Sequence, residues 1–84
     1  MELKERITTV LDQHGIDQNR EIIIRSSTGS LYHIPISRLL DVIGNLYKKQ
    51  QRIISEKLDE VESCANQLMD FMYYLAKPLA KIRI

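Results

Sequence analysis

The stretch that decides the fold runs from Arg38 to Ala76 and reads RLLDVIGNLYKKQQRIISEKLDEVESCANQLMDFMYYLA. It contains no proline, and from Ile54 onward apolar residues recur at alternating spacings of four and three. This heptad repeat is typical of a helix that packs along one seam. The residues of the predicted seam are Ile54, Leu58, Val61, Ala65, Leu68, Met72 and Leu75.

A helix over residues 38–76 is too long for a single copy of the chain to cover. At 1.5 Å per residue it would measure about 58 Å. A compact chain of 84 residues is only about 30 Å across. We therefore predict that the seam forms the interface of a homo-oligomer, a dimer or a higher even-numbered assembly. A break in the helix near Gly44 or near Ser55 is the alternative that the pattern leaves open.

Charges along the same stretch favour an antiparallel arrangement of the two helices. Lys48, Lys49 and Arg52 form a positive block, and residues 56–62 form a mainly acidic one. A parallel pair would set like charges together, whereas an antiparallel pair that crosses near Ser55 sets opposite charges together. Because exposed ion pairs contribute only about 0–1 kcal/mol each, we expect the charges to choose the orientation and apolar burial to supply the affinity.

The sequence before this stretch predicts a short helix followed by a β-hairpin. Residues 2–14 place their apolar side chains on one helical face, and Gly15 suits a left-handed position just past the helix. Two β-branched or aromatic runs within residues 20–36 flank a turn of small residues, which is typical of a hairpin. Pro35 cannot donate to a ladder, so the second strand should be an edge or end there. Alternation predicts one buried face, made of Ile22, Ile24, Tyr32, Ile34 and Ile36.

Together these patterns predict one α+β domain over residues 1–84. The expected order is a short N-terminal helix, a β-hairpin, and a long C-terminal helix that forms an antiparallel helical oligomer interface. The expected ranges are 2–14 for the first helix, 20–36 for the hairpin, 38–76 for the long helix and 77–84 for a tail or short strand.

Composition argues against several classes of protein. The net charge of +1 argues against a strongly basic nucleic-acid coat, and the hydrophobic fraction of 44% is too high for intrinsic disorder. No apolar run approaches the ~20 residues of a membrane span, so we expect no membrane association. The first residues lack the pattern of a signal peptide, and the single Cys64 allows no internal disulfide. We therefore expect a cytoplasmic protein.

The chain carries no recognisable motif for catalysis or metal binding. Its three glycines are isolated, so neither a phosphate loop nor a dinucleotide-binding loop occurs. His14, His33 and Cys64 show no spacing typical of metal ligands. We predict no catalytic residue, no metal site and no cofactor, and thus a protein that is not an enzyme.

Three surface features are candidate contact sites for a partner or ligand. They are the outward face of the hairpin, an aromatic residue beside three cations, and a run of large side chains near the end of the long helix. The candidate contact residues are Arg25, Tyr32, His33, Tyr47, Lys48, Lys49, Arg52, Tyr73 and Tyr74.

The function predicted from these features is non-enzymatic binding, by an adaptor or inhibitor that acts through a protein–protein surface. One alternative is a dimeric nucleic-acid-binding transcriptional regulator that uses Arg25 or the positive block. A further alternative is sequestration of a small anionic or nucleotide ligand between subunits by Arg25, Tyr32 and His33. The expected partners are a second copy and another protein, with nucleic acid or a small anion as the alternatives.

Overall fold

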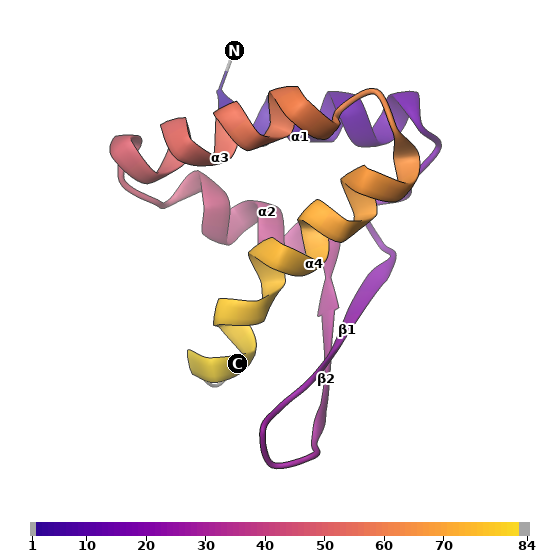
Figure 1. Cartoon of the computed structure of the whole chain (residues 1–84), viewed down its shortest axis with the longest axis vertical. Helices are drawn as coiled ribbons and strands as arrows, with labels where there is room; N and C mark the ends of the chain where they lie inside the picture. Colours follow the sequence, from indigo (N-terminus) through magenta and orange to yellow (C-terminus); the bar gives the residue numbers. More distant parts are fainter. Residues whose placement is uncertain (1, 83–84) are drawn as a thin grey trace.

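Residues 2–82 of this protein are described by a computed structural model, with side chains through residue 78. This part of the chain contains four helices and a β-hairpin, and the hairpin extends away from the helices (Figure 1). In chain order the elements are α1 (Leu3–Gln13), β1 (Glu21–Arg25), β2 (Leu31–Pro35), α2 (Ile36–Gly44), α3 (Lys48–Val61) and α4 (Ala65–Ile82).

The first helix ends as its sequence predicts. Gly15 has a φ of 70°, and the N–H of Ile16 donates to the Leu11 carbonyl at 2.9 Å. The N–H of Gly15 donates to the Asp12 carbonyl at 3.1 Å, which completes a Schellman motif. Ile16 is buried and so anchors the chain as it leaves α1.

The hairpin has the predicted buried face. β1 and β2 pair antiparallel, with Ile22 opposite Ile34 and Ile24 opposite Tyr32. The isoleucines of this face are buried and Tyr32 is half-buried. β2 ends at Pro35, as expected for a strand that a proline terminates. In the turn, Gly29 has a φ of 90°, which only glycine adopts easily.

The single helix predicted over residues 38–76 is replaced by three helices. The break between α2 and α3 lies just after Gly44, one of the two positions left open, whereas Ser55 lies inside α3. At this break, the side-chain amide of Asn45 donates to the Asp41 carbonyl at 3.0 Å. The side chain thus satisfies a carbonyl that the helix leaves unpaired at its end. The polar side chain offers the backbone an alternative to continuing the helix.

The second break, at residues 62–64, involves a contact from the other end of the chain. The N–H of Cys64 donates to the Val61 carbonyl at 3.1 Å, which tightens the end of α3. The ring Nε2 of His14 donates to the Glu62 carbonyl at 2.7 Å. A side chain beside the end of α1 therefore satisfies a backbone group at the turn, which the heptad pattern did not reveal.

The three helices fold back so that α3 and α4 pack on each other and α4 packs on β1. The described chain measures 36 × 28 × 19 Å, well short of the rod predicted from residues 38–76. The length argument for an oligomer therefore no longer applies. The predicted seam residues Ile54, Leu58, Leu68 and Met72 are buried in the core of the same chain.

The last predicted segment is also helical as far as it is described. α4 continues through Pro78 to Ile82, where a tail or short strand over 77–84 was expected. A proline in a helix removes one N–H donor and the hydrogen bond it would make. The residues around Pro78 keep their own N–H donors, so the helix continues beyond the proline. Residues 83–84 lie outside the described part.

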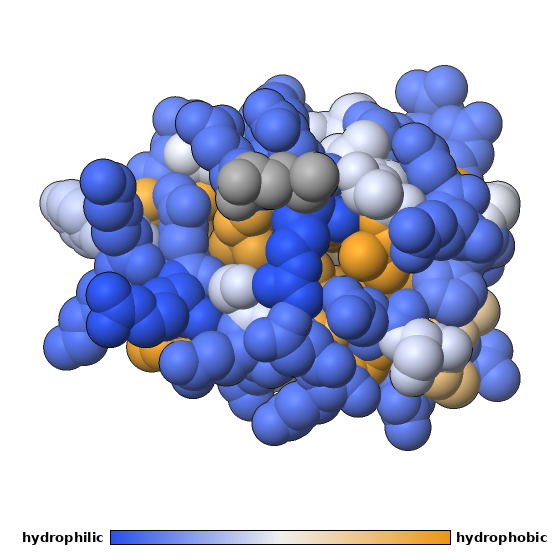
Figure 2. All heavy atoms as spheres, turned by 90° about the horizontal axis from the view of Figure 1, so that it is seen from above, coloured by the Kyte–Doolittle hydropathy of each residue, from blue (hydrophilic) through white to orange (hydrophobic). Residues whose placement is uncertain are grey.

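The face formed by α1 and α3 is mainly hydrophilic, with hydrophobic residues visible between the hydrophilic ones (Figure 2). No helix in residues 2–82 is both long and apolar enough to cross a membrane.

Candidate functional site

The outer face of the hairpin exposes apolar side chains among charged ones. Ile23 is 47% exposed and Leu31 is 53% exposed. They lie on neighbouring strands, because Ile23 is opposite His33 and Leu31 is opposite Arg25. The Nδ1 of His33 lies 3.9 Å from a carboxylate oxygen of Glu21, too far for a hydrogen bond. This face, consisting of Glu21, Ile23, Arg25, Leu31 and His33, is called the outer face below.

The hydrogen bonds at the two ends of the hairpin show which backbone groups face outward. The Arg20 carbonyl accepts from the Ile36 N–H at 3.0 Å, and the Ser26 N–H donates to the Ser30 carbonyl at 2.8 Å. Successive residues of a strand alternate in the side to which their backbone groups point. The even-numbered residues of both strands therefore direct their backbone N–H and C=O groups toward the neighbouring strand of the hairpin. The odd-numbered residues direct these groups away from it, toward the two outer edges of the hairpin.

Within one chain, the structure does not bring together the three residues predicted to hold a small anion between subunits. Arg25 and His33 lie on the outer face, whereas Tyr32 is opposite Ile24 on the inner face and is half-buried. Because successive side chains of a strand point to opposite faces, Tyr32 and His33 cannot converge on one ligand from the same hairpin.

The aromatic residue and cations predicted as a contact patch lie at the start of α3. Tyr47 precedes the helix and is 82% exposed, and Lys48, Lys49 and Arg52 are exposed in its first turns. Within residues 2–82 no salt bridge of these three cations is recorded. Cations at a helix N-terminus are repelled by the helix dipole, so this end of α3 is the more positive one.

The two tyrosines of α4 have different surroundings. Tyr74 is 54% exposed, and the Nζ of Lys57 on α3 lies 5.2 Å from the centre of its ring. This distance allows a cation–π interaction between α3 and α4. Tyr73 is 37% exposed. Tyr74 thus has a packing role within the chain that the sequence interpretation did not assign to it.

The rest of the predicted seam is only partly enclosed. Val61 and Leu75 are half-buried and pack against the core, and Ala65 is exposed at the start of α4. The seam residues that are most buried, Ile54, Leu58, Leu68 and Met72, belong to the common core of the chain. Of the predicted seam, only Val61, Ala65 and Leu75 leave surface for a contact with a second copy.

A cluster around Arg6 was missed by the sequence reasoning. Its Nη1 donates to the Ser55 hydroxyl at 2.7 Å, and its Nη2 donates to Glu62 at 3.1 Å and to Asp59. The hydrogen bond to Asp59 raises the pKa of Arg6 above its ordinary value, with Glu62 adding to it against a lowering effect of burial. In the sequence, the one indication of this cluster is that Arg6 directly precedes Ile7, an apolar residue of α1.

This cluster weakens the charge argument for an antiparallel helical dimer. Asp59 and Glu62 belong to the acidic block that was expected to meet the positive block of a second copy. In the structure both carboxylates bind Arg6 of the same chain. The acidic block is therefore partly neutralised before any partner arrives.

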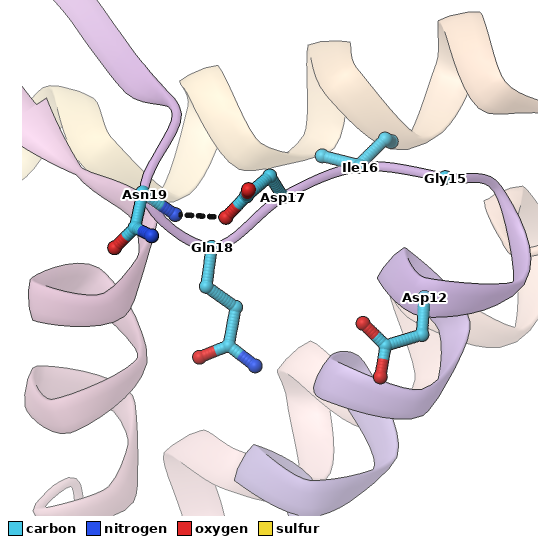
Figure 3. Close-up of a pocket in the computed structure, with 6 residues that line it drawn as sticks. All are labelled: Asp12, Gly15, Ile16, Asp17, Gln18 and Asn19. Atoms are coloured by element: carbon cyan, nitrogen blue, oxygen red, sulfur yellow. Dashed lines mark hydrogen bonds between the residues drawn. The ribbon is translucent and has the colours of Figure 1, made fainter.

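The loop between α1 and β1 borders a wide, open hollow of about 540 Å³ (Figure 3). Asp12 and Gln18 direct their side chains toward it, and a carboxylate oxygen of Asp17 accepts a hydrogen bond from the Asn19 N–H at 2.8 Å. That bond is a local turn contact. Neither here nor elsewhere among the described side chains is a group of three or more His, Cys, Asp or Glu placed to hold a metal ion.

Comparison of the chain with protein-family models, with curated proteins and with solved structures found no match.

Proposed function

We propose that this chain is a non-enzymatic binding protein, an adaptor or inhibitor, that contacts another protein through the outer face of its hairpin. The observation that carries the proposal is the exposure of Ile23 and Leu31 on one face of a hairpin that extends from the helices. Apolar groups next to charged ones are typical of a protein contact surface, where the apolar groups supply affinity and the charges supply orientation.

The partner surface that fits this face has an apolar centre and an acidic group at one end. The apolar centre would meet Ile23 and Leu31. Arg25 is exposed on the same face, and no salt bridge of its guanidinium is recorded within residues 2–82. A guanidinium binds a carboxylate with two parallel hydrogen bonds, so an acidic side chain of the partner would fix the orientation.

The experiment compares which other proteins are captured by three immobilised forms of the chain. These are the unchanged chain, the variant Leu31→Lys and the variant Ile53→Lys. Ile53, on α3, is 49% exposed, close to the 53% of Leu31, so the two variants expose the same charge from similarly exposed sites. We expect a partner that is retained by the unchanged chain and by Ile53→Lys but lost with Leu31→Lys. Equal capture by both variants, with both folded by circular dichroism, would contradict the proposal.

A second candidate function, nucleic-acid binding, is favoured by the exposed cations at the start of α3. Lys48, Lys49 and Arg52 are exposed in the first turns of α3, directly after the exposed Tyr47, and such residues can contact phosphates and stack on a base. Retention on DNA or RNA at increasing salt tests it. Binding through these cations should weaken steeply with salt, by a log–log slope of about 0.9 for each phosphate neutralised, and should be reduced in the double variant Lys48→Gln, Lys49→Gln.

A further inference from the structure

The two outer edges of the hairpin are chemically unlike. On β2, the outward positions are Leu31, His33 and Pro35, and the proline has no N–H to offer. Prolines of this kind protect an edge strand from pairing with another strand. On β1, the outward positions are Glu21, Ile23 and Arg25. Each of these residues carries both an N–H and a C=O.

The edge of β1 is open and suited to pairing. Its sequence, EIIIR, has three consecutive isoleucines and neither a proline nor a glycine. Outside the hairpin ladder, no recorded hydrogen bond of the described side chains or backbone reaches the outward groups of β1. The helix that packs against β1 is α4, and the buried residues of the strand are Ile22 and Ile24, on its inner face. An apolar edge with unpaired backbone groups is a template for another strand.

The charges of β1 make this edge complementary to itself. Glu21 and Arg25 lie at its two ends, with Ile23 at its centre. Two copies of β1 that run antiparallel about a two-fold axis at Ile23 place Glu21 of each copy opposite Arg25 of the other. Opposite charges directly across a strand pair stabilise it, and a two-fold axis makes the contact twice.

The backbone parity agrees with the same register. The residues at 21, 23 and 25 direct their N–H and C=O groups to the open edge, so each opposed pair of them can exchange two hydrogen bonds. The two neighbouring two-fold registers, centred on Ile22 or Ile24, set Glu21 or Arg25 opposite an isoleucine and pair fewer residues. Only the register about Ile23 satisfies the charges and pairs the whole strand.

We propose that β1 is the dimerisation edge of this protein and that its partner there is a second copy of the chain. The product is a four-stranded antiparallel sheet in the order β2-β1-β1-β2. Because its axis is perpendicular to the sheet, Ile22 of one copy lies beside Ile24 of the other on the inner, helix-covered side. The dimer contact and the proposed protein contact both use Arg25, whereas Leu31, on β2, takes no part in the dimer.

Charge reversal tests the register directly. Sedimentation equilibrium measures the affinity of the dimer, and we expect the unchanged chain to dimerise. Glu21→Arg and Arg25→Glu should each weaken the affinity of the dimer about tenfold or more, because two attractive charge pairs become repulsive. An equimolar mixture of the two variants should form a heterodimer, and the double variant Glu21→Arg, Arg25→Glu should recover self-association. Loss of a structural role alone would not be rescued by mixing two impaired chains.

A proline scan provides the matched control for the edge. Ile23 and His33 are opposite each other, and the N–H of each points away from the hairpin. Ile23→Pro should abolish the dimer and His33→Pro should leave it intact. A chain that stays monomeric at its highest soluble concentration, or a dimer that none of these variants alters, would overturn the proposal. Capture of another protein is measured separately, so a failed dimer leaves the proposed function standing, and the reverse also holds.

Discussion

The α3–α4 pair and the hairpin both carry regular apolar patterns, but the chain encloses them differently. Leu58 on α3 and Leu68 on α4 are fully buried, whereas Ile23 on the hairpin is 47% exposed. A helix has one apolar stripe, and a turn between two helices lets each stripe cover the other. A strand has two faces and two edges, and a two-stranded hairpin can bury only one face against the helices. Apolar periodicity therefore predicts that a face of a helix or strand is buried. The topology decides whether the same chain buries that face.

The largest expected difference between the two regions is in stability. Leu68→Ala should lower the free energy of unfolding by about 2–5 kcal/mol, because it leaves a cavity between α4 and its neighbours. Ile23→Ala should change it by less than about 0.5 kcal/mol, since the side chain is half in solvent already. Urea denaturation of both variants measures this. A small effect of Leu68→Ala would show that the seam is not enclosed within one chain.

The next largest loss of stability should come from breaking the ion cluster around Arg6, which joins α1 to α3. Arg6→Met keeps the apolar stem but removes hydrogen bonds to three partners, and we expect a loss of about 1–2 kcal/mol. Lys4→Met is the control, because the Lys4–Asp41 pair joins α1 to α2 with both side chains well exposed. Exposed pairs contribute little, so Lys4→Met should cost less than about 0.5 kcal/mol. Equal losses in thermal or urea unfolding would contradict the assigned role of Arg6.

The last comparison is between two glycines, one in the hairpin turn and one at the end of α2, for which we expect effects of opposite sign. Gly29→Ala in the hairpin turn should destabilise the fold by about 1–2 kcal/mol, because its φ of 90° disfavours any side chain. Gly44→Ala should stabilise it by about 0.5–1 kcal/mol, since alanine favours a helix. A Cβ at Gly44 would meet the Lys4 side chain at 3.5 Å, an ordinary contact.

The glycine pair also tests why the long helix breaks. If α2 and α3 are separated by the contacts of the fold, the Gly44→Ala variant keeps the break, and its circular dichroism changes little. A clear gain of helix signal would show instead that Gly44 alone interrupts one continuous helix.

The parts of the fold that were predictable rest on contacts between near neighbours. The Schellman motif at Gly15 involves residues a few positions apart, and the inner face of the hairpin follows from the alternation of Ile22 and Ile24. The break near Gly44 was an open alternative, because Asn45 supplies a local signal. The second break was missed, since no glycine or proline marks residues 62–64.

The candidate site was predictable in part for the same reason. The outward position of Arg25 and His33 followed from strand alternation alone. The partners of Arg6 did not, since Asp59 lies 53 positions further along the chain. The open edge of β1 also needed the structure, because the sequence does not say which backbone groups face β2.

By itself, the sequence determined the local conformations: where α1 ends, which face of the hairpin is apolar, and where Pro35 stops a strand. Only the tertiary structure decided that the heptad seam closes on itself. At the turn between α3 and α4, His14 donates to a carbonyl from 48 positions away. Hydrogen bonds and apolar burial across such separations depend on how the whole chain packs, and no local pattern of residues encodes them.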